Sequence, residues 1–228
     1  MDTERLKTGR LRFRGQPEPG VVGFVIWRRQ HGGLVFWTNL LDTGAQTRAQ
    51  GAISFFNSPE FKLAGLYITN AYTAILNRDP DYPGWNFWFG EIRNGQPTIS
   101  VVDSFITSTE FVLTYGSLNN TQFVQLVYQN VLGRAADSGG LNFWVAQLVA
   151  GETRAQMMND FMISLEYAAR VRTRQLSNLC YLGFLGRTPE SAGRLFWTGA
   201  LDGGLSEADL VNNFIASVEY QLRLGGTL

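Results

Sequence analysis

Residues 123–167 read FVQLVYQNVLGRAADSGGLNFWVAQLVAGETRAQMMNDFMISLEY, and this stretch decides the fold because the rest of the chain contains three less complete copies of it. A pattern that recurs every 20 to 50 residues or so indicates a repeat architecture, in which each unit buries its apolar face against its neighbours. The 228 residues therefore predict four related units in one array.

A Phe-Trp pair sets the alignment of the copies. The tryptophans are 51, 56 and 53 residues apart, at Trp37, Trp88, Trp144 and Trp197, and each directly follows a phenylalanine, Phe36, Phe87, Phe143 and Phe196. A glycine lies four residues before each tryptophan, at Gly33, Gly84, Gly140 and Gly193. Each copy then ends in Phe-x-x-Ser-x-Glu-aromatic, with the glutamates at Glu60, Glu110, Glu166 and Glu219.

These spacings predict an all-α tandem array of four helical repeats of about 50 residues. The expected division is a flexible basic arm over 1–20, a degenerate repeat 1 over 21–65, repeat 2 over 66–116, repeat 3 over 117–176 and repeat 4 over 177–228. A terminal repeat is expected to be atypical because it caps the stack. The only obvious hinge is at 116–120, where it could divide the protein into two pairs.

Within repeat 3, apolar residues at helical spacing predict a first helix that ends at Gly133. A short turn follows, and a second helix is expected to end at Gly151. A third helix begins near Glu152 or Thr153. Ser164 is expected to cap a further helical segment, because a serine side chain accepts hydrogen bonds from a helix N-terminus.

Composition limits the classes of partner. Formal net charge is zero, so the chain lacks the basic field of a nucleic-acid binder. No window of about 18 apolar residues predicts membrane insertion, and the start of the sequence lacks the apolar region of a signal peptide. The single cysteine, Cys180, excludes an internal disulfide and is expected to be a buried thiol. The basic arm is expected to be a solvated tail, with contact to an anionic partner as the alternative.

The tryptophans are expected to fasten helix to helix in the core, because an aromatic ring recurring at one place in every copy is more often a packing residue. The alternative is stacking on sugar rings. Three copies also contain an arginine six residues before the glycine and an acid three before it. We expect Arg78, Arg134 and Arg187 to stabilise the turn by binding those acids, or Glu110, Glu166 and Glu219.

Metal binding and catalysis find little support. The Asp79-x-Asp81-x-x-Gly84 run resembles the start of a calcium loop, but its twelfth position is Gly90 where that loop needs a glutamate. The single histidine, His31, has no triad partner placed by sequence logic, and no phosphate-binding or zinc motif is present. We therefore expect no cofactor, no bound metal and no enzymatic activity, although a carboxylate pair brought together by folding could act as acid and base.

The run LYxxVLGRxxDxxGLxxWxxxLxxG, followed by FxxSxE-aromatic, resembles a bacterial repeat of unknown function that occurs in surface-layer, RTX-type and other exported proteins. Repeat 3 matches this run nearly completely, and repeat 1 matches only after Gly33. A fainter similarity, to the helical linker domains of phycobilisomes, implies scaffolding by protein contact. The calcium-binding nonapeptides that accompany the module in RTX proteins are missing here.

The sequence thus predicts a non-enzymatic structural or interaction module, for scaffolding or assembly at the bacterial cell surface, that binds protein partners or itself. One alternative is a glycan-binding, lectin-like module, which exposed aromatic rings along one groove would favour. The other is an intracellular linker that joins larger subunits, with a cytoplasmic location.

Overall fold

The structure, a computed structural model, describes the backbone of residues 31–225 and the side chains from Phe36 onward. The expectations for the basic arm and for the side chain of His31 lie outside the described residues. Residues 31–225 form helices and turns and no strand, in tandem units, so the predicted all-α repeat fold is confirmed. None of the helices in this range is both long and apolar enough to span a membrane.

The helices follow the repeats. Repeat 1 contributes α2 (His31–Asp42), α3 (Arg48–Phe56) and α4 (Pro59–Phe61), and repeat 2 has η1 (Lys62–Leu66), α5 (Tyr67–Ile75), α6 (Tyr82–Arg93), α7 (Ile99–Ile106) and α8 (Thr109–Tyr115). Repeat 3 has α9 (Asn120–Val127), η2 (Tyr128–Leu132), α10 (Ser138–Ala150) and α11 (Arg154–Met162). Repeat 4 has α12 (Leu165–Cys180), η3 (Tyr181–Leu185), α13 (Ser191–Asp202), α14 (Glu207–Ala216) and α15 (Val218–Arg223). The helices η1 and α12 cross the expected boundaries at 65 and 176 and belong to the first helices of repeats 2 and 4, so Arg174 and Gln175 are part of repeat 4.

The junctions between repeats are of two kinds. From repeat 1 to repeat 2 the chain runs without a break through α4, η1 and α5, and from repeat 3 to repeat 4 it does so through α12 and η3. Between repeats 2 and 3 the helix ends at Gly116, whose φ of 74° lies in the region that favours glycine. The predicted break thus coincides with the end of α8, and α9 begins again at Asn120.

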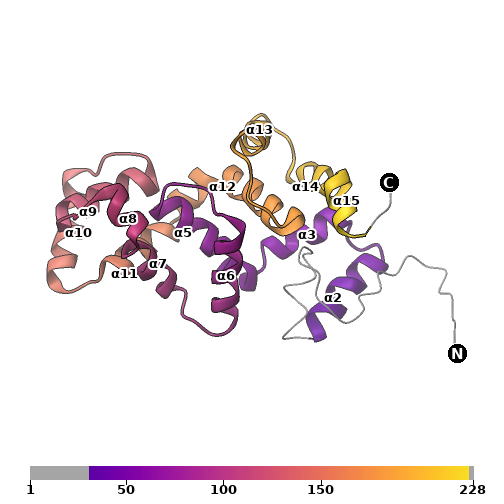
Figure 1. The fold of residues 1–228 in the computed structure, drawn as a ribbon, viewed down its shortest axis with the longest axis horizontal. Coiled ribbons are helices and arrows are strands. Elements are labelled where there is room, and N and C mark those ends of the chain that lie inside the picture. Colours follow the sequence, from indigo (N-terminus) through magenta and orange to yellow (C-terminus); the bar gives the residue numbers. More distant parts are fainter. Residues whose placement is uncertain (1–30, 226–228) are drawn as a thin grey trace, which may run out of the picture.

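The repeats pair in a nested order that the sequence did not predict. The third helices of repeats 1 and 4, α3 and α14, pack together, and so do those of repeats 2 and 3, α7 and α11. The first helices α5 and α12 meet in the middle of an elongated body whose one end carries α9 and α10 (Figure 1). One continuous cluster of buried apolar side chains joins all four repeats.

The repeated Ser-x-Glu-aromatic segment is a helix cap. In every copy the serine side chain accepts a hydrogen bond from the backbone N–H of the aromatic residue three positions later. In repeats 2 to 4 the same hydroxyl also donates to the carbonyl of the preceding phenylalanine. A serine in this position satisfies an N–H group that the first helical turn leaves unpaired, which explains the recurring spacing.

Candidate functional site

The four tryptophans pack against the core. Each lies against the phenylalanine of the third helix in its own repeat, with ring centroids 6.2, 5.9, 5.3 and 5.4 Å apart along the chain. All four are partly buried against the core cluster. The structure thus places these rings between the second and third helices, where they hold the two together.

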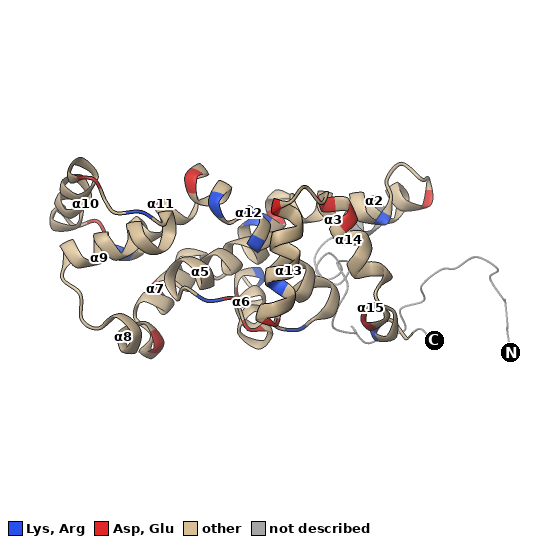
Figure 2. Ribbon diagram, turned by 90° about the horizontal axis from the view of Figure 1, so that it is seen from above, with Lys and Arg blue, Asp and Glu red and all other residues tan. Residues whose placement is uncertain are grey.

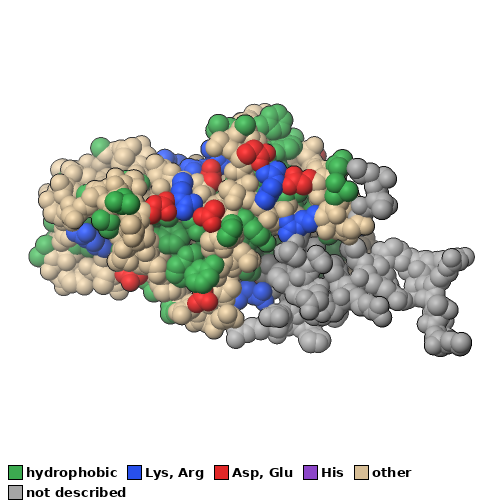
Figure 3. Space-filling view, in the orientation of Figure 1, with side chains coloured by type: hydrophobic (Ala, Val, Ile, Leu, Met, Phe, Trp, Pro, Cys, Tyr) green, Lys and Arg blue, Asp and Glu red, His purple; other side chains and the backbone are tan. Residues whose placement is uncertain are grey.

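The phenylalanine before each tryptophan has the opposite position. Phe36, Phe87, Phe143 and Phe196 are 56, 58, 53 and 64% exposed. Each contacts its tryptophan edge to face, with centroids 4.9 to 5.2 Å apart, and leaves the rest of the ring in water. Apolar side chains also reach the surface between charged ones in Figure 3. The result is an exposed aromatic ring at one place in every repeat.

The turn arginines form the same ion pair in three repeats. Arg78 donates to both carboxylate oxygens of Glu110, at 2.6 and 3.0 Å. Arg134 does so with Glu166 at 2.8 and 3.3 Å, and Arg187 with Glu219 at 2.5 and 3.0 Å. Each pair is 32 residues apart in sequence, so the fork ties the turn before the second helix to the cap after the third.

The acid of each turn also faces its arginine. Arg78 pairs with Asp81 at 3.1 Å, Arg134 lies 3.9 Å from Asp137, and Arg187 pairs with Glu190. Figure 2 shows such acidic and basic segments spread along the molecule rather than gathered at one end. Both kinds of acid named from the sequence therefore contact the arginine at once.

A tyrosine lies under each guanidinium and explains the glycine before the tryptophan. The arginine carbon is 4.8, 5.2 and 4.8 Å from the ring centroids of Tyr72, Tyr128 and Tyr181. A Cβ added at the glycine would lie only 2.1 to 2.2 Å from the hydroxyl of that tyrosine, at Gly84, Gly140 and Gly193. Only a residue without a side chain leaves room for the tyrosine.

The ionisable groups of the turn are held in their ordinary charge states. The Arg187 guanidinium lowers the pKa of Glu190, and Arg134 lowers that of Glu166. Burial works against the ionised form of Asp81, but hydrogen bonds from Gly84 and Arg78 hold its pKa below the usual value. Carboxylates with lowered pKa values remain ionised at neutral pH, which suits ion pairing rather than proton transfer.

The residues of the suspected calcium loop face cations of the protein itself. Asp79 binds Arg174 and Arg194, at 2.8 and 2.5 Å. Within the described part of the chain, no three His, Cys, Asp or Glu side chains are grouped as a metal site would need. Cys180 is fully buried, and burial raises the pKa of its thiol, as a structural cysteine requires.

A buried polar network joins repeats 2 and 4 across α5 and α12. The Gln175 amide donates to Asn70 Oδ1 at 2.9 Å and to Thr73 Oγ1 at 2.7 Å, and Thr73 also bonds the Tyr167 hydroxyl. The Asn178 amide donates to Asp79 at 3.0 Å. The sequence did not predict this network, because Asn70, Thr73 and Asn178 have no identical counterpart in the other repeats and a repeated residue does not show which repeat it contacts.

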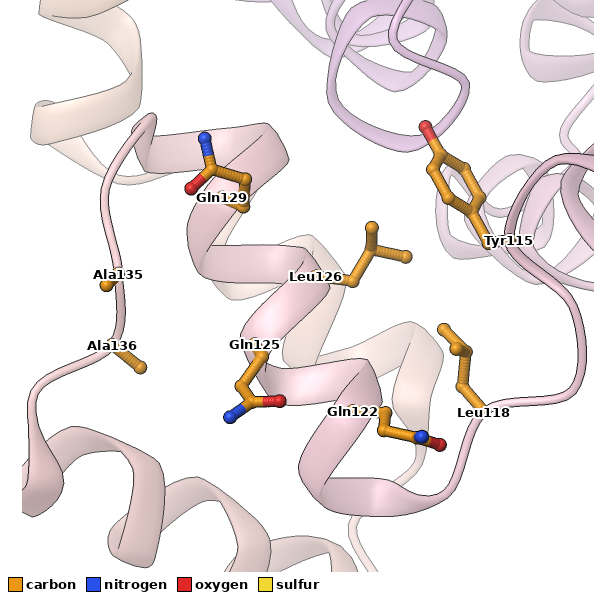
Figure 4. Close-up of a pocket in the computed structure, with 8 residues that line it drawn as sticks. All are labelled: Tyr115, Leu118, Gln122, Gln125, Leu126, Gln129, Ala135 and Ala136. Carbon is orange, nitrogen blue, oxygen red and sulfur yellow. The ribbon is translucent and has the colours of Figure 1, made fainter.

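A pocket of about 450 Å³ lies beside the broken junction in repeat 3 (Figure 4). Tyr115 and Leu118 border it from the junction, while Gln122, Gln125 and Gln129 line it from α9 and η2. Among the described residues, no charged side chain borders it. Its size falls within the range of ligand pockets, and its lining of amides and apolar groups suits a neutral partner.

The comparisons with known proteins agree with the repeat structure. A family model described as "Domain of unknown function (DUF4214)" matches residues 64–112, 102–171 and 166–224. Each matched segment contains a first helix, the arginine turn and the Phe-Trp pair, and repeat 1 lies almost wholly outside them. Neither the curated proteins nor the solved structures contain a match.

Proposed function

The chain belongs to the DUF4214 family through three tandem segments, and from that premise we propose that it is a non-enzymatic interaction and assembly module at the bacterial cell surface. The observation that carries this proposal is the exposed phenylalanine of each repeat. An array that presents one equivalent ring per unit binds a repetitive or self-complementary partner several times at once, and linked contacts of this kind raise apparent affinity without any new contact.

The surroundings of these rings favour protein partners. The same helices expose further apolar side chains, such as Val149 in α10 and Leu195 in α13, at 75 and 59%. Aromatic and aliphatic side chains that gather on a surface suit the core of a protein interface. A phenylalanine also lacks the polar edge with which Trp or Tyr would bind the hydroxyl groups of a sugar.

The repeated ionisable residues support a structural role rather than a catalytic one. Their carboxylates bind the turn arginines, and the lowered pKa values of Glu166 and Glu190 keep these two charged. The proposed location rests on the resemblance of the repeat motif to repeats of surface-layer and other exported proteins. An intracellular linker with a cytoplasmic location is the alternative with the same chemistry.

A glycan-binding module is the second candidate function. It is favoured by the same four half-exposed rings, because an aromatic face stacks on the apolar face of a pyranose. The two candidates differ in what competes with binding. A soluble saccharide would displace the protein from a glycan, whereas it would leave a protein contact intact.

The test compares the wild-type chain with the variant Phe36→Ala/Phe87→Ala/Phe143→Ala/Phe196→Ala. We expect wild-type protein to co-sediment with bacterial cell envelopes and the variant to lose at least about tenfold of that binding, since several aromatic contacts are removed together. A matched control replaces exposed asparagines instead, as Asn142→Ala/Asn212→Ala. Envelope binding by the four-site variant at wild-type strength would refute the proposal, and release by free saccharides would favour the glycan alternative.

A further inference from the structure

Repeats 2, 3 and 4 can be superposed in sequence on their turn arginines. Arg78 and Arg134 are 56 residues apart, and Arg134 and Arg187 are 53 apart. We call five residues of repeat 3 that line the pocket the amide face: Gln122, Gln125, Leu126, Gln129 and Ala135. By these offsets, Gln125, Leu126, Gln129 and Ala135 correspond in repeat 2 to Thr69, Asn70, Thr73 and Asp79. In repeat 4, Gln122, Gln125 and Ala135 correspond to Gln175, Asn178 and Thr188.

These equivalent positions are the ones through which repeats 2 and 4 hold each other. Gln175 of repeat 4 donates to Asn70 and Thr73 of repeat 2. Asn178 donates to Asp79, and the Thr188 hydroxyl accepts from the backbone N–H of Tyr82 at 2.9 Å. The positions equivalent to the amide face therefore form the contact surface between repeats 2 and 4.

In repeat 3 this face is open. The side chains of Gln125 and Gln129 are exposed and make no hydrogen bond to any residue of the described range. Figure 4 shows them on one helix, with the loop that carries Ala135 and Ala136 on one side and Tyr115 and Leu118 on the other. Repeat 3 forms the end of the body opposite the described ends of the chain, so a second molecule can approach it (Figure 1).

Charge identifies the occupant of the amide face. The internal contact is asymmetric, because Asp79 of repeat 2 meets Arg174 and Arg194 of repeat 4. The equivalents of these three residues in repeat 3 are uncharged: Ala135, Thr121 and Leu141. A twofold contact places each surface against its own copy, so like charges would repel there, whereas a neutral face does not. A glutamine amide both donates and accepts, and so it complements another glutamine.

We propose that the amide face of repeat 3 is an interface between two copies of this chain related by a twofold axis. It reproduces between chains the contact that repeats 2 and 4 make within one chain. The inference deepens the proposed assembly function, on which it rests, by naming one partner as a second copy. The exposed phenylalanines remain available for other contacts.

The experiment measures mass by light scattering across concentration. Wild-type protein is expected to pass from the 25.5 kDa monomer to twice that mass. Two variants, Gln125→Lys/Gln129→Lys and Gln125→Glu/Gln129→Glu, should each dimerise at least about a hundredfold more weakly, because each presents like charges to its own copy. An equal mixture of the two variants should form dimers again, since the faces are then oppositely charged.

The controls separate this interface from a loss of folding and from the phenylalanine surface. Both glutamines are exposed and outside the capping boxes, so the variants should keep the wild-type circular dichroism and melting temperature. The double variant Asn142→Lys/Asn212→Lys adds the same charge elsewhere and should still dimerise. The four-site phenylalanine variant should also form the dimer. A wild-type chain that stays monomeric, or charged variants that keep the dimer mass, would overturn the inference, whatever the outcome of the envelope assay.

Discussion

Repeats 2 and 3 have the same turn and different faces. In both, an arginine binds a glutamate 32 residues later and lies over a tyrosine, whose hydroxyl leaves room only for a glycine before the tryptophan. On the adjacent first helix, however, Thr69 and Thr73 of repeat 2 are buried against repeat 4, whereas Gln125 and Gln129 of repeat 3 face solvent. The residues that recur build the unit, and the residues that vary decide which units meet.

The junctions differ in the same way. The helix that enters repeat 2 is continuous from Pro59 to Ile75, but the helix that would enter repeat 3 ends at Gly116 and restarts at Asn120. Tyr115 and Leu118 of the broken junction border the open pocket. The break over residues 116–119 thus leaves the fold of repeat 3 intact and places junction residues at the edge of its open pocket.

The largest expected loss of stability comes from a change at the contact between repeats 2 and 4. Asp79→Ala leaves the partly buried Arg174 and Arg194 without their shared carboxylate, and removing one partner of such a group should cost about 3 kcal/mol of the free energy of unfolding. The matched change Ala135→Asp puts a carboxylate at the equivalent exposed position of repeat 3. It should shift the free energy of unfolding by less than about 0.5 kcal/mol.

Urea unfolding of the two variants measures this contrast. The mid-point of Asp79→Ala should move well below that of the wild type, while the mid-point of Ala135→Asp stays close to it. Equal losses in both variants would mean that the two faces do not differ in burial as described.

The second effect should be the same in both repeats because it acts on the turn. Gly84→Ala and Gly140→Ala each place a Cβ 2.1 or 2.2 Å from a tyrosine hydroxyl, and overpacking of this kind should cost about 2 kcal/mol. Gly90→Ala is the control, since nothing lies within 4 Å of its added Cβ and the residue is inside α6. It should stabilise the protein by about 0.5 kcal/mol. Calorimetric melting temperatures would show the opposite signs, and a neutral Gly140→Ala would contradict the close tyrosine contact.

The repeated parts of this architecture were predictable from the sequence because each appears several times. Four Phe-Trp pairs and four Ser-x-Glu segments indicated the helices, and the caps at Ser108 and Ser164 lie where the pattern predicts. The sequence also pointed to both acids that bind Arg78, since they stand at a constant distance from it. A constant spacing implies a contact inside the unit.

The nested pairing and the amide face were not predictable in this way. The contact of α3 with α14 joins segments about 160 residues apart, and the sequence of one repeat does not indicate which other repeat it packs on. Asp79 and Asn178 have no identical counterpart in the other repeats, and Gln175 recurs as Gln122 but is buried in one repeat and exposed in the other, so the repeat pattern does not indicate this contact. The sequence also did not show which ring of the Phe-Trp pair is buried. Adjacent helical positions differ in direction by about 100°, so either ring could face the core.

The serine caps should stabilise repeats 2 and 3 equally, although the junctions after them differ. Ser108 begins the short helix before the break, and Ser164 begins the long helix into repeat 4, yet both accept from an aromatic N–H, at 3.1 and 3.2 Å. Ser108→Ala and Ser164→Ala should therefore each cost about 1 kcal/mol. Replacement by aspartate, which also caps, should restore most of the loss. If urea unfolding showed a loss at only one of the two sites, the cap would depend on the junction rather than on the repeat.

The smallest effect concerns the acid of the turn and its response to pH. Arg187 lowers the pKa of Glu190 from its ordinary value of 4.5, so the unfolded chain takes up a proton at this site more readily than the folded chain. The stabilisation is therefore complete above about pH 4.5 and is lost as pH falls through the lowered value. Because the pair is half exposed, Glu190→Gln should cost less than about 1 kcal/mol at pH 7. The difference between wild type and variant in urea mid-point should shrink to zero on acidification. It should also shrink in 1 M salt, because salt screens exposed pairs. A difference that persisted undiminished at pH 2.5 would show that Glu190 acts in this turn by packing and not by charge.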